Sequence, residues 1–396
     1  MVGQQSQRHL RRRVLAGFGA FGAWWGAWGA LVPSVQVNAG VDDGELGAAL
    51  LFIGIGALAS MRIIGALIDR FGRAVLPLSV LAFAATGLGP GFAQGRVQLA
   101  AALFLVGASS GAMDVAINTG SSQYESAAKQ PIMNLAHGVF SLGVILASIL
   151  VGLLRSMQLA PAAILGVLAL VFVTVAAWIH LEGRGEQSIG RRTVGRPPTR
   201  SRSWAPSPRL VSLGMLTALA YLVENAWQSW SAVHLERTLA ARPAVSALGP
   251  AVFGAAAAAG RFGGHRLTGT MTRQSLVRRG ASVAAVGTLV AAAAPTVPMA
   301  LVAIAGAGLG TAVCAPSLFS LAGSGVAEGA RGTSISTVTT LAYLGFVVGP
   351  AVVGLTARLT SLPIALGSVS IAAVILAITA DRARGAEDDR GTKGKS

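Results

Sequence analysis

The chain has 396 residues, of which 53% are hydrophobic and 12% are charged, whereas soluble domains carry about 25% charged residues. This composition excludes a water-soluble globular protein and predicts a membrane protein. The net charge of +16 does not predict nucleic-acid binding, because the basic residues fall in the gaps between apolar runs and not in one patch with interleaved aromatic residues.

Apolar runs of about twenty residues recur along the chain, and a helix of that length crosses the ~30 Å hydrocarbon core of a bilayer. The first run is too long for the apolar region of a signal peptide, so we expect a retained helix. The twelve predicted spans are 14–36, 46–67, 75–94, 97–120, 131–154, 160–181, 209–233, 245–266, 275–295, 298–323, 333–357 and 362–380.

A polar segment rich in Arg, Pro and Ser separates the sixth span from the seventh and predicts a linker between two six-helix halves. We therefore expect five parts: an N-terminal tail at 1–13, a first half at 14–181, a linker at 182–208, a second half at 209–380 and a C-terminal tail at 381–396.

The basic residues predict how the chain sits in the membrane. With the N-terminus inside and the sides alternating at each span, five of the 31 basic residues fall at the outer side. These five are Arg96, Arg155, Arg237, Arg242 and Arg358. The positive-inside rule therefore predicts a multi-pass protein of the cytoplasmic membrane with both termini and the linker in the cytoplasm.

Span one carries three tryptophans, Trp24, Trp25 and Trp28, near mid-depth, away from the interfaces where tryptophan usually anchors helices. Trp24 and Trp28 share one face of this helix, because they are four residues apart. Spans one and seven hold equivalent places in the two halves, and span seven also carries an aromatic face. We expect these faces to stack against a ring or a sugar face of a solute, and core packing is the alternative.

A charged side chain at the bilayer centre costs about 2.5 to 3.5 kcal/mol on insertion scales, so ionisable residues inside spans are functional candidates. Arg62, Asp114 and Glu224 each lie about one helical turn or more inside a predicted end. Asn118 follows Asp114 on the same helix face. We expect Arg62 and Asp114 to pair within the first half and Asp114 to be a candidate for proton coupling. The alternative is a pair with a purely structural role.

Span five contributes three polar residues at helical spacing, Asn134, His137 and Ser141, toward its predicted cytoplasmic end. Asn134 and His137 lie one turn apart and are candidates for solute binding. His137 is also a candidate proton relay, because histidine titrates near neutral pH. The alternative is a histidine that only forms an interhelical hydrogen bond.

Span seven presents a polar and aromatic face around one carboxylate, and this face is the predicted solute site. Its residues at helical spacing are Tyr221, Glu224, Trp227, Gln228 and Ser231. Glu224 has no basic neighbour on its own helix, so reversible protonation is the expected way to hold it at this depth. We expect Glu224 to carry the coupling proton, and a neutral structural hydrogen bond is the alternative.

Residues 65–73 read GALIDRFGR and lie between spans two and three. The pattern G-x-L-x-D-R-x-G-R closely resembles the signature of the major facilitator superfamily at this place. The resemblance implies a conformational latch, in which glycines permit a tight turn and an aspartate bonds a neighbouring helix end when the cytoplasmic side is closed. The implied latch residues are Gly65, Asp69, Arg70, Gly72 and Arg73. The alternative is that the two arginines only enforce topology and bind anionic lipid.

Four further segments are similar to a bacterial branch grouped with the rhizopine transport protein and distantly with fucose permeases. They are DVAIN at 114–118, HGVFSLG at 137–143, VENAWQSWSAVHL at 223–235 and LAYLGFVVGP at 341–350. The resemblance implies an all-α polytopic membrane protein with twelve transmembrane helices in two pseudo-symmetric six-helix halves. It implies transport without naming a substrate.

The G-x-x-x-G-P pattern typical of many drug/proton antiporters occurs in their span five. Here such a pattern lies in span eleven instead, as Gly345, Gly349 and Pro350. This difference disfavours a drug exporter. In span eleven the pattern predicts close helix packing and a kink.

These observations together favour a secondary active transporter. We expect proton-coupled movement of a small polar solute, sugar-like or cyclic, by alternating access of two halves. A proton-driven exporter of drugs or metabolites and a non-transporting membrane sensor are the alternatives. The chain has no nucleotide-binding loop, nucleophile elbow or metal-ligand pattern, so we expect no enzymatic activity, no cofactor and no metal. The expected partners are the solute, protons and the lipid bilayer, with no nucleic acid, and we expect a monomer.

Overall fold

The computed structural model describes residues 2–184, 207–267, 270–324 and 331–380. Within these ranges twelve helical segments are long and apolar enough to cross a membrane, which confirms the predicted number of spans. The helices are α1 (Val2–Ala39), α2 (Asp43–Phe71), α3 (Val75–Thr86), α4 (Gly89–Phe92), α5 (Gly95–Ala128), α6 (Met133–Ser156), α7 (Pro161–Arg184), α8 (Pro208–Arg237), α9 (Pro243–Ser246), α10 (Leu248–Leu267), α11 (Arg273–Ala293), α12 (Val297–Ala312), α13 (Cys314–Gly323), α14 (Arg331–Leu359) and α15 (Leu362–Thr379).

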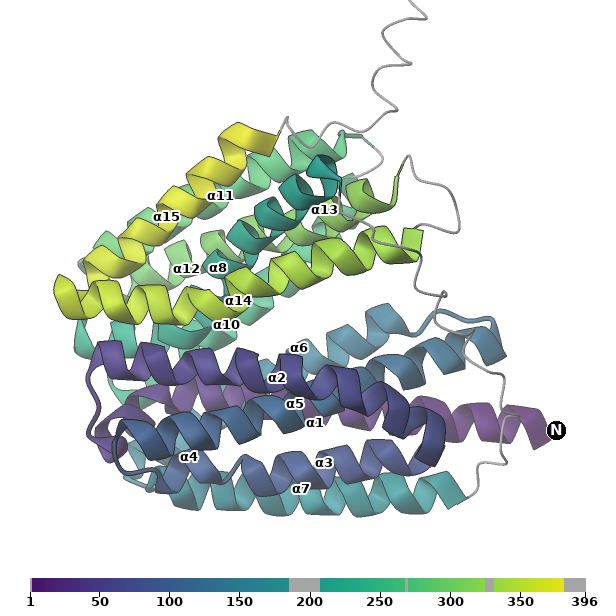
Figure 1. Cartoon of the computed structure of the whole chain (residues 1–396). Helices are drawn as coiled ribbons and strands as arrows, with labels where there is room; N and C mark the ends of the chain where they lie inside the picture. Colours follow the sequence, from purple (N-terminus) through teal and green to yellow (C-terminus); the bar gives the residue numbers. More distant parts are fainter. Residues whose placement is uncertain (1, 185–206, 268–269, 325–330, 381–396) are drawn as a thin grey trace, which may run out of the picture.

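The helices form two groups, with α1 to α7 in a first half and α8 to α15 in a second half (Figure 1). The closest pairs within the first half are α1 with α6 and α2 with α5, and within the second half α8 with α14 and α11 with α12. We call the end where α1 begins and α7 stops the linker end, and the opposite end the far end. Residues 185–206 and 381–396, most of the expected linker and tail, lie outside the described residues.

The two halves meet at the far end and diverge toward the linker end (Figure 1). At the far end α2 and α14 are in direct contact, since a Cβ atom on Gly47 would lie 2.8 Å from the Cα of Gly354. Gly152 of α6 likewise lies against Ala247, where a Cβ would be 2.5 Å from the alanine methyl group. The absence of side chains at these glycines permits this close approach.

The helix ends follow from local sequence. Asp42 caps α2 by accepting a hydrogen bond from the Glu45 N–H at 2.8 Å, and the Glu45 side chain accepts one from the Asp42 N–H at 3.3 Å. This reciprocal pair satisfies two amide groups that the first turn leaves without helical partners. Ser207 and Ser361 cap α8 and α15 in the same position, each followed by a proline in the first turn.

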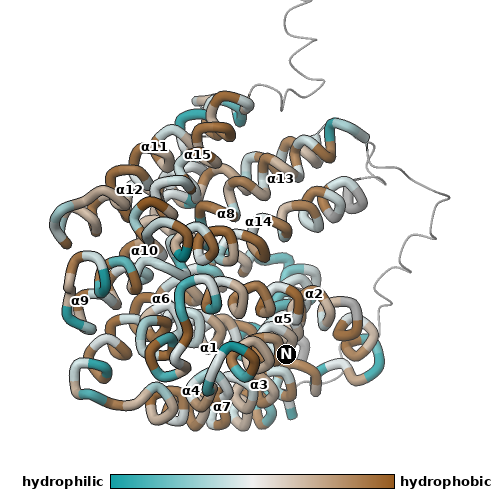
Figure 2. The backbone as a smooth tube through the Cα atoms, turned by 60° about the vertical axis from the view of Figure 1, so that its left-hand side comes forward, coloured by the Kyte–Doolittle hydropathy of each residue, from teal (hydrophilic) through white to brown (hydrophobic). Residues whose placement is uncertain are grey.

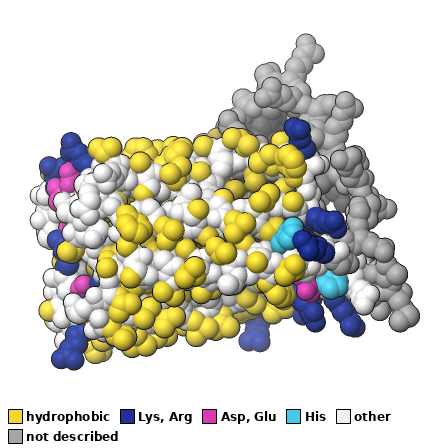
Figure 3. All heavy atoms as spheres, turned by 90° about the horizontal axis from the view of Figure 1, so that it is seen from below, with side chains coloured by type: hydrophobic (Ala, Val, Ile, Leu, Met, Phe, Trp, Pro, Cys, Tyr) yellow, Lys and Arg dark blue, Asp and Glu magenta, His cyan; other side chains and the backbone are white. Residues whose placement is uncertain are grey.

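The surface is divided as a membrane protein requires. Apolar residues line the middle stretches of the helices, and polar ones gather at helix ends and in the connections (Figure 2). A hydrophobic belt separates two charged ends, and acidic side chains accompany the arginines at the far end (Figure 3). The five arginines expected at the outer side all lie at or beside helix ends there. Which end faces the cytoplasm stays a prediction.

The first helix is longer than predicted. It begins at Val2, so residues 2–13 of the expected tail continue span one as helix. The Gln7 amide donates to the Ala127 carbonyl at 3.0 Å, and the His9 Nδ1 lies 2.9 Å from a Glu182 carboxylate oxygen. These contacts attach the beginning of α1 to the linker-end termini of α5 and α7. The sequence pattern did not reveal them, because the segment has no apolar periodicity.

Span eleven packs as its glycines predict. A Cβ atom on Gly345 would overlap the Ala218 carbonyl oxygen of α8, and Pro350 lies inside α14. A side chain at Gly345 must therefore force the two helices apart. Gly166 of α7 offers a matched site within a helix, since nothing lies within 4 Å of the position that its Cβ would occupy.

We expect Gly345→Ala to lower the free energy of unfolding by about 1 to 3 kcal/mol, the usual cost of overpacking. Gly166→Ala should leave stability unchanged or slightly higher, because alanine favours helix. Thermal melting of both purified variants in detergent measures the difference. Equal melting temperatures for the two variants would show that α8 and α14 can move apart at Gly345 without a loss of stability.

Candidate functional site

Polar side chains from five helices gather between the two halves, from the middle of the spans toward the linker end. The first half contributes residues of α5 and α6, and the second half contributes residues of α8, α10 and α14. We call this group the central polar cluster, and its members are Asp114, Asn118, His137, Tyr221, Glu224, Gln228, Arg261 and Tyr343.

An ion pair forms the second-half side of the cluster. The Arg261 Nη2 of α10 lies 3.0 Å from the Glu224 Oε1 of α8, and the Gln228 Nε2 donates to the same oxygen at 3.1 Å. The Glu224 side chain is 14% exposed and that of Arg261 is 44% exposed. Gln228 lies one turn after Glu224, so local helix geometry places both on one face. The carboxylate is thus held by one cation and one amide while the cation stays accessible.

A second carboxyl group lies on the first-half side. The Asn118 amide donates to the Asp114 Oδ1 at 3.0 Å and to the Asp114 backbone carbonyl at 2.9 Å. Asp114 lies near Tyr221 and Tyr343 of the second half. Arg261 of the second half likewise lies near His137, which is exposed. The polar groups of the two halves therefore face one another.

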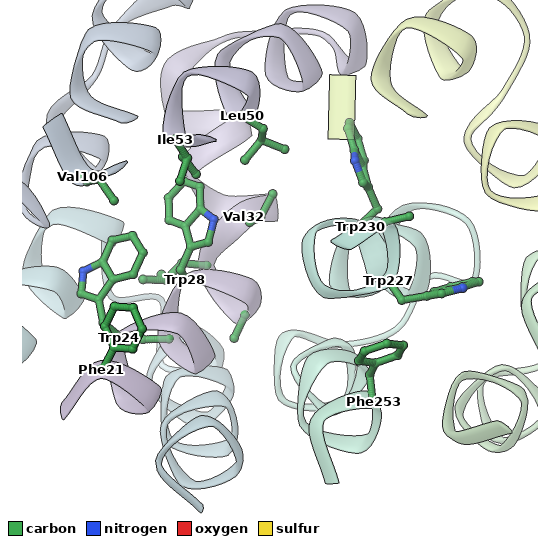
Figure 4. Close-up of a cluster of buried hydrophobic side chains, with 14 of the residues drawn as sticks. Phe21, Trp24, Trp28, Val32, Leu50, Ile53, Val106, Trp227, Trp230 and Phe253 are labelled. Carbon is green, nitrogen blue, oxygen red and sulfur yellow. The ribbon is translucent and has the colours of Figure 1, made fainter. Parts of the chain in front are cut away.

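Two of the predicted span-seven residues point elsewhere. Trp227 is fully buried and donates from its indole N–H to the Thr288 hydroxyl of α11 at 3.1 Å. Figure 4 shows its ring directed away from Trp24 and Trp28. Ser231 is also fully buried and lies beside Gly249. The predicted face is too wide for one side of the helix. The residues at its edge, Trp227 and Ser231, therefore point into the interior of the second half.

The tryptophans of span one are divided in the same way. Trp24 is 2% exposed and packs inside the first half (Figure 4). Its ring centroid lies 4.8 Å from that of Phe83. Trp28 stacks on Trp24 with centroids 5.6 Å apart. Core packing, the alternative to stacking on a solute, therefore describes Trp24. Trp28 is also only 2% exposed, and it and its neighbour Trp25 border a small cavity between the halves.

This small cavity lies between the central polar cluster and the far end. Its polar lining comes from α8, where the Ser229 hydroxyl donates to the Asn225 side-chain oxygen at 3.0 Å and the Asn225 amide bonds the Phe346 carbonyl of α14. The lining residues are Trp25, Trp28, Leu50, Ile53, Gly54, Asn225, Ser229, Phe346 and Pro350. Aromatic residues of both halves thus line the cavity: Trp25 and the predicted Trp28 from α1, and Phe346 of α14 where the prediction had span seven.

Two predicted residues of the first half, Asn134 and Arg62, are not seen to join the central polar cluster. Asn134 is exposed in the first turn of α6. The side chain of Arg62 lies outside the described residues, so its pairing with Asp114 stays a prediction.

The latch segment lies at the linker end, where the halves diverge. Gly72 has φ of +53°, a conformation that glycine adopts readily, and it allows the turn after α2. The Arg73 guanidinium donates to the Gly183 carbonyl at 3.3 Å. Asp69 and Arg70 are exposed, and nothing lies within 4 Å of the side-chain position at Gly65. Closure by the latch, which concerns a different conformation, stays a prediction.

Sequence reasoning missed Arg261, Tyr343 and Asn225. Arg261 lies within the predicted eighth span and so carried the same signal of a costly intramembrane charge that selected Glu224. Its role depends on the packing of α10 against α8, which the sequence of α8 alone does not contain. Asn225 is adjacent to Glu224 and faces α14 instead.

Twelve spans in two halves, with polar side chains between the halves, are an architecture typical of membrane transporters. A model of the Major Facilitator Superfamily matches residues 14–350, and the chain belongs to this family. An uncharacterized MFS-type transporter of Yersinia pestis is 30% identical over 369 residues, which are 89% of this chain and 90% of that protein. The protein is therefore a transporter and not an enzyme. Membrane protein MosC of Rhizobium meliloti is 27% identical over 354 residues, 89% of this chain and 84% of that protein.

Solved structures share the same architecture. A variant of the nucleoside transporter NupG has a TM-score of 0.79 at 14% identity, with 94% of this chain and 99% of that chain covered. A D-xylose-proton symporter has a TM-score of 0.69 at 13% identity, with 94% and 96% covered. The predicted fold of twelve helices in two pseudo-symmetric halves is confirmed.

Proposed function

We propose that this transporter couples proton movement to the passage of a small polar solute, sugar-like or cyclic, and that Glu224 carries the proton. The observation that carries the proposal is the Glu224 and Arg261 pair within the central polar cluster. The sequence prediction noted that Glu224 has no basic neighbour on its own helix, and α10 supplies one in Arg261. A proton and the Arg261 guanidinium then compete for the same carboxylate, so protonation would release the arginine.

Several groups support a polar solute. Asp114, Asn118, His137 and Gln228 offer both hydrogen-bond donors and acceptors around the pair, as hydroxyl-rich or cyclic solutes require. Two proteins of the same fold are named for nucleoside transport and for D-xylose and proton symport. Trp24, Trp227 and Ser231 are left out of the proposed site because they are buried inside one half.

We expect Glu224→Gln to abolish proton-driven accumulation of the solute while exchange of labelled for unlabelled solute continues. A glutamine keeps the shape and the hydrogen bond from Gln228 but carries no titratable proton. A thermal-shift screen first identifies a ligand, and uptake into proteoliposomes under a pH gradient then measures coupling. Glu45→Gln is the matched control, because Glu45 pairs with Arg96 at the far end within the first half.

Undiminished proton coupling in Glu224→Gln would contradict the assignment. The sign of accumulation in the parent protein separates import from export, and hence the proposed solute transporter from an exporter of drugs or metabolites. A protein that binds ligands without any flux would be a membrane sensor.

We also propose the cytoplasmic membrane as the location, with both termini and the linker end in the cytoplasm, and a monomer as the working unit. The distribution of arginine supports this orientation. Protease access to terminal tags in right-side-out and inverted vesicles tests it.

A further inference from the structure

Helix α14 contains a proline, Pro350, in its interior. Proline has no backbone N–H, so the carbonyl of Phe346, four residues earlier, lacks its usual donor within the helix. The side-chain amide of Asn225 on α8 donates to this carbonyl instead. We infer that Asn225 replaces the missing donor and thereby makes residues 346–350 a joint, at which α14 bends while the two halves move. The inference rests on the alternating movement in the proposed function, but not on its proton or its solute.

The Asn225 side chain is held in position for this bond. The Ser229 hydroxyl, one turn later on α8, donates to the Asn225 side-chain oxygen at 3.0 Å. This bond fixes which end of the side chain is the acceptor, so the amide N–H groups face α14. Asn225 and Ser229 are each 7% exposed, so water has little access to replace them. A buried carbonyl without a donor is costly, and the Asn225 amide removes that cost at the joint.

The two ends of α14 are attached to different halves of the protein. Before the joint, a Cβ atom on Gly345 would overlap the Ala218 carbonyl oxygen of α8, so this part packs against its own half. After the joint, a Cβ atom on Gly47 of α2 would lie 2.8 Å from the Gly354 Cα, so the last turns pack against the first half. A rigid helix could not keep both contacts when the halves move. A joint between them lets each part follow its own neighbour.

The small cavity lies directly beside the joint. Phe346 and Pro350 line it from the second half, and Trp28 and Gly54 line it from the first half. A close-packed interior resists displacement, whereas a cavity gives a helix space to move. The place where α14 lacks a helical hydrogen bond is therefore also a place where it has room to bend.

The first test is a double-mutant cycle between Asn225 and Pro350. Asn225→Leu removes the donor and keeps a side chain of similar size. We expect it to lower the melting temperature by roughly 2 to 4 °C. In a Pro350→Ala background the same change should have less than half of this effect, because the backbone N–H at position 350 then serves the Phe346 carbonyl.

Two further variants make the cycle specific. Ser229→Ala removes only the bond that orients the amide, so it should give a smaller loss with the same reduction in the Pro350→Ala background. Ser148→Ala is the matched control, because its hydroxyl donates to the Gly26 carbonyl at 2.9 Å within the first half. Its effect on the melting temperature should be the same with and without the proline.

The second test measures bending within α14. Spin labels replace Ile335 and Leu355, which are exposed on either side of the joint, in a background with Cys314→Ser. A straight helix places these positions about 30 Å apart, a distance that pulsed dipolar spectroscopy resolves. We expect a broad or double distance distribution in the reconstituted parent and a single narrower one in Pro350→Ala, because an uninterrupted helix resists bending.

A parent distribution as narrow as that of Pro350→Ala would overturn the inference, because α14 would then be rigid. A loss of stability in Asn225→Leu that Pro350→Ala does not reduce would overturn it as well, since Asn225 would then only fill space. If Asn225→Leu fails to fold, Ser229→Ala provides the same comparison. Loss of proton coupling in Glu224→Gln concerns another site, so failure of the joint and failure of the proposed function are separable.

Discussion

Replacing Arg261 with glutamine is expected to reduce proton-driven transport by roughly tenfold or more, which corresponds to about 1.5 kcal/mol. The change leaves the Glu224 carboxylate, 14% exposed, without the cation that lies 3.0 Å away. A buried charge without its partner is costly, and here the cost is reduced because Arg261 itself is partly exposed. Uptake into proteoliposomes under a pH gradient measures the effect.

Two further variants make this result specific. Arg266→Gln removes an exposed charge from the same helix and should transport as the parent does. The exchange of both charges, Arg261→Glu with Glu224→Arg, should restore part of the activity if the pair itself matters. Parental transport by a folded Arg261→Gln protein would show that the pair is only structural.

The largest loss of stability is expected from Trp227→Ala. Trp227 is fully buried in the second half, and truncation of a buried tryptophan costs about 3 kcal/mol or more, chiefly through the cavity that it leaves. Trp227→Phe fills most of the space and loses only the bond to Thr288, about 1 kcal/mol. Trp178→Ala is the control, because this tryptophan is 42% exposed on α7 and should melt near the parent temperature.

Thermal melting, together with ligand titration, separates a structural role of Trp227 from a role in binding. If Trp227 has a structural role, Trp227→Ala lowers the stability of the protein, while Trp227→Phe binds the ligand as tightly as the parent. Unchanged stability with a loss of ligand binding would place the ring in the solute site, as the sequence pattern predicted.

The fold was largely predictable, because a bilayer demands an apolar run of fixed length for each span. The charged gaps between runs then fixed the number of spans. Interruptions within a span were not predictable from length. The tenth span, for example, is divided at Val313 into α12 and α13.

The site was predictable only one helix at a time. Periodicity identified the face that carries Tyr221, Glu224 and Gln228, but could not set its edge, so the predicted face also took in Trp227, whose ring bonds Thr288 inside the second half. The periodicity of one helix could not identify the partners of its side chains on other helices. Glu236, the acid that pairs with Arg155, is 81 residues away in the chain, and only the packing of α6 against the second half brings the two together.

The helical start of α1 has a practical consequence for handling the protein. This segment bonds to three neighbouring parts of the first half: Gln7 to Ala127 of α5, His9 to Glu182 of α7 and Arg13 to Arg73 after α2. It therefore connects them to one another. A truncation that removes the first thirteen residues would remove all three bonds, and a bulky fusion placed against the segment would disturb them. Affinity handles and fluorescent reporters therefore belong at the carboxyl terminus.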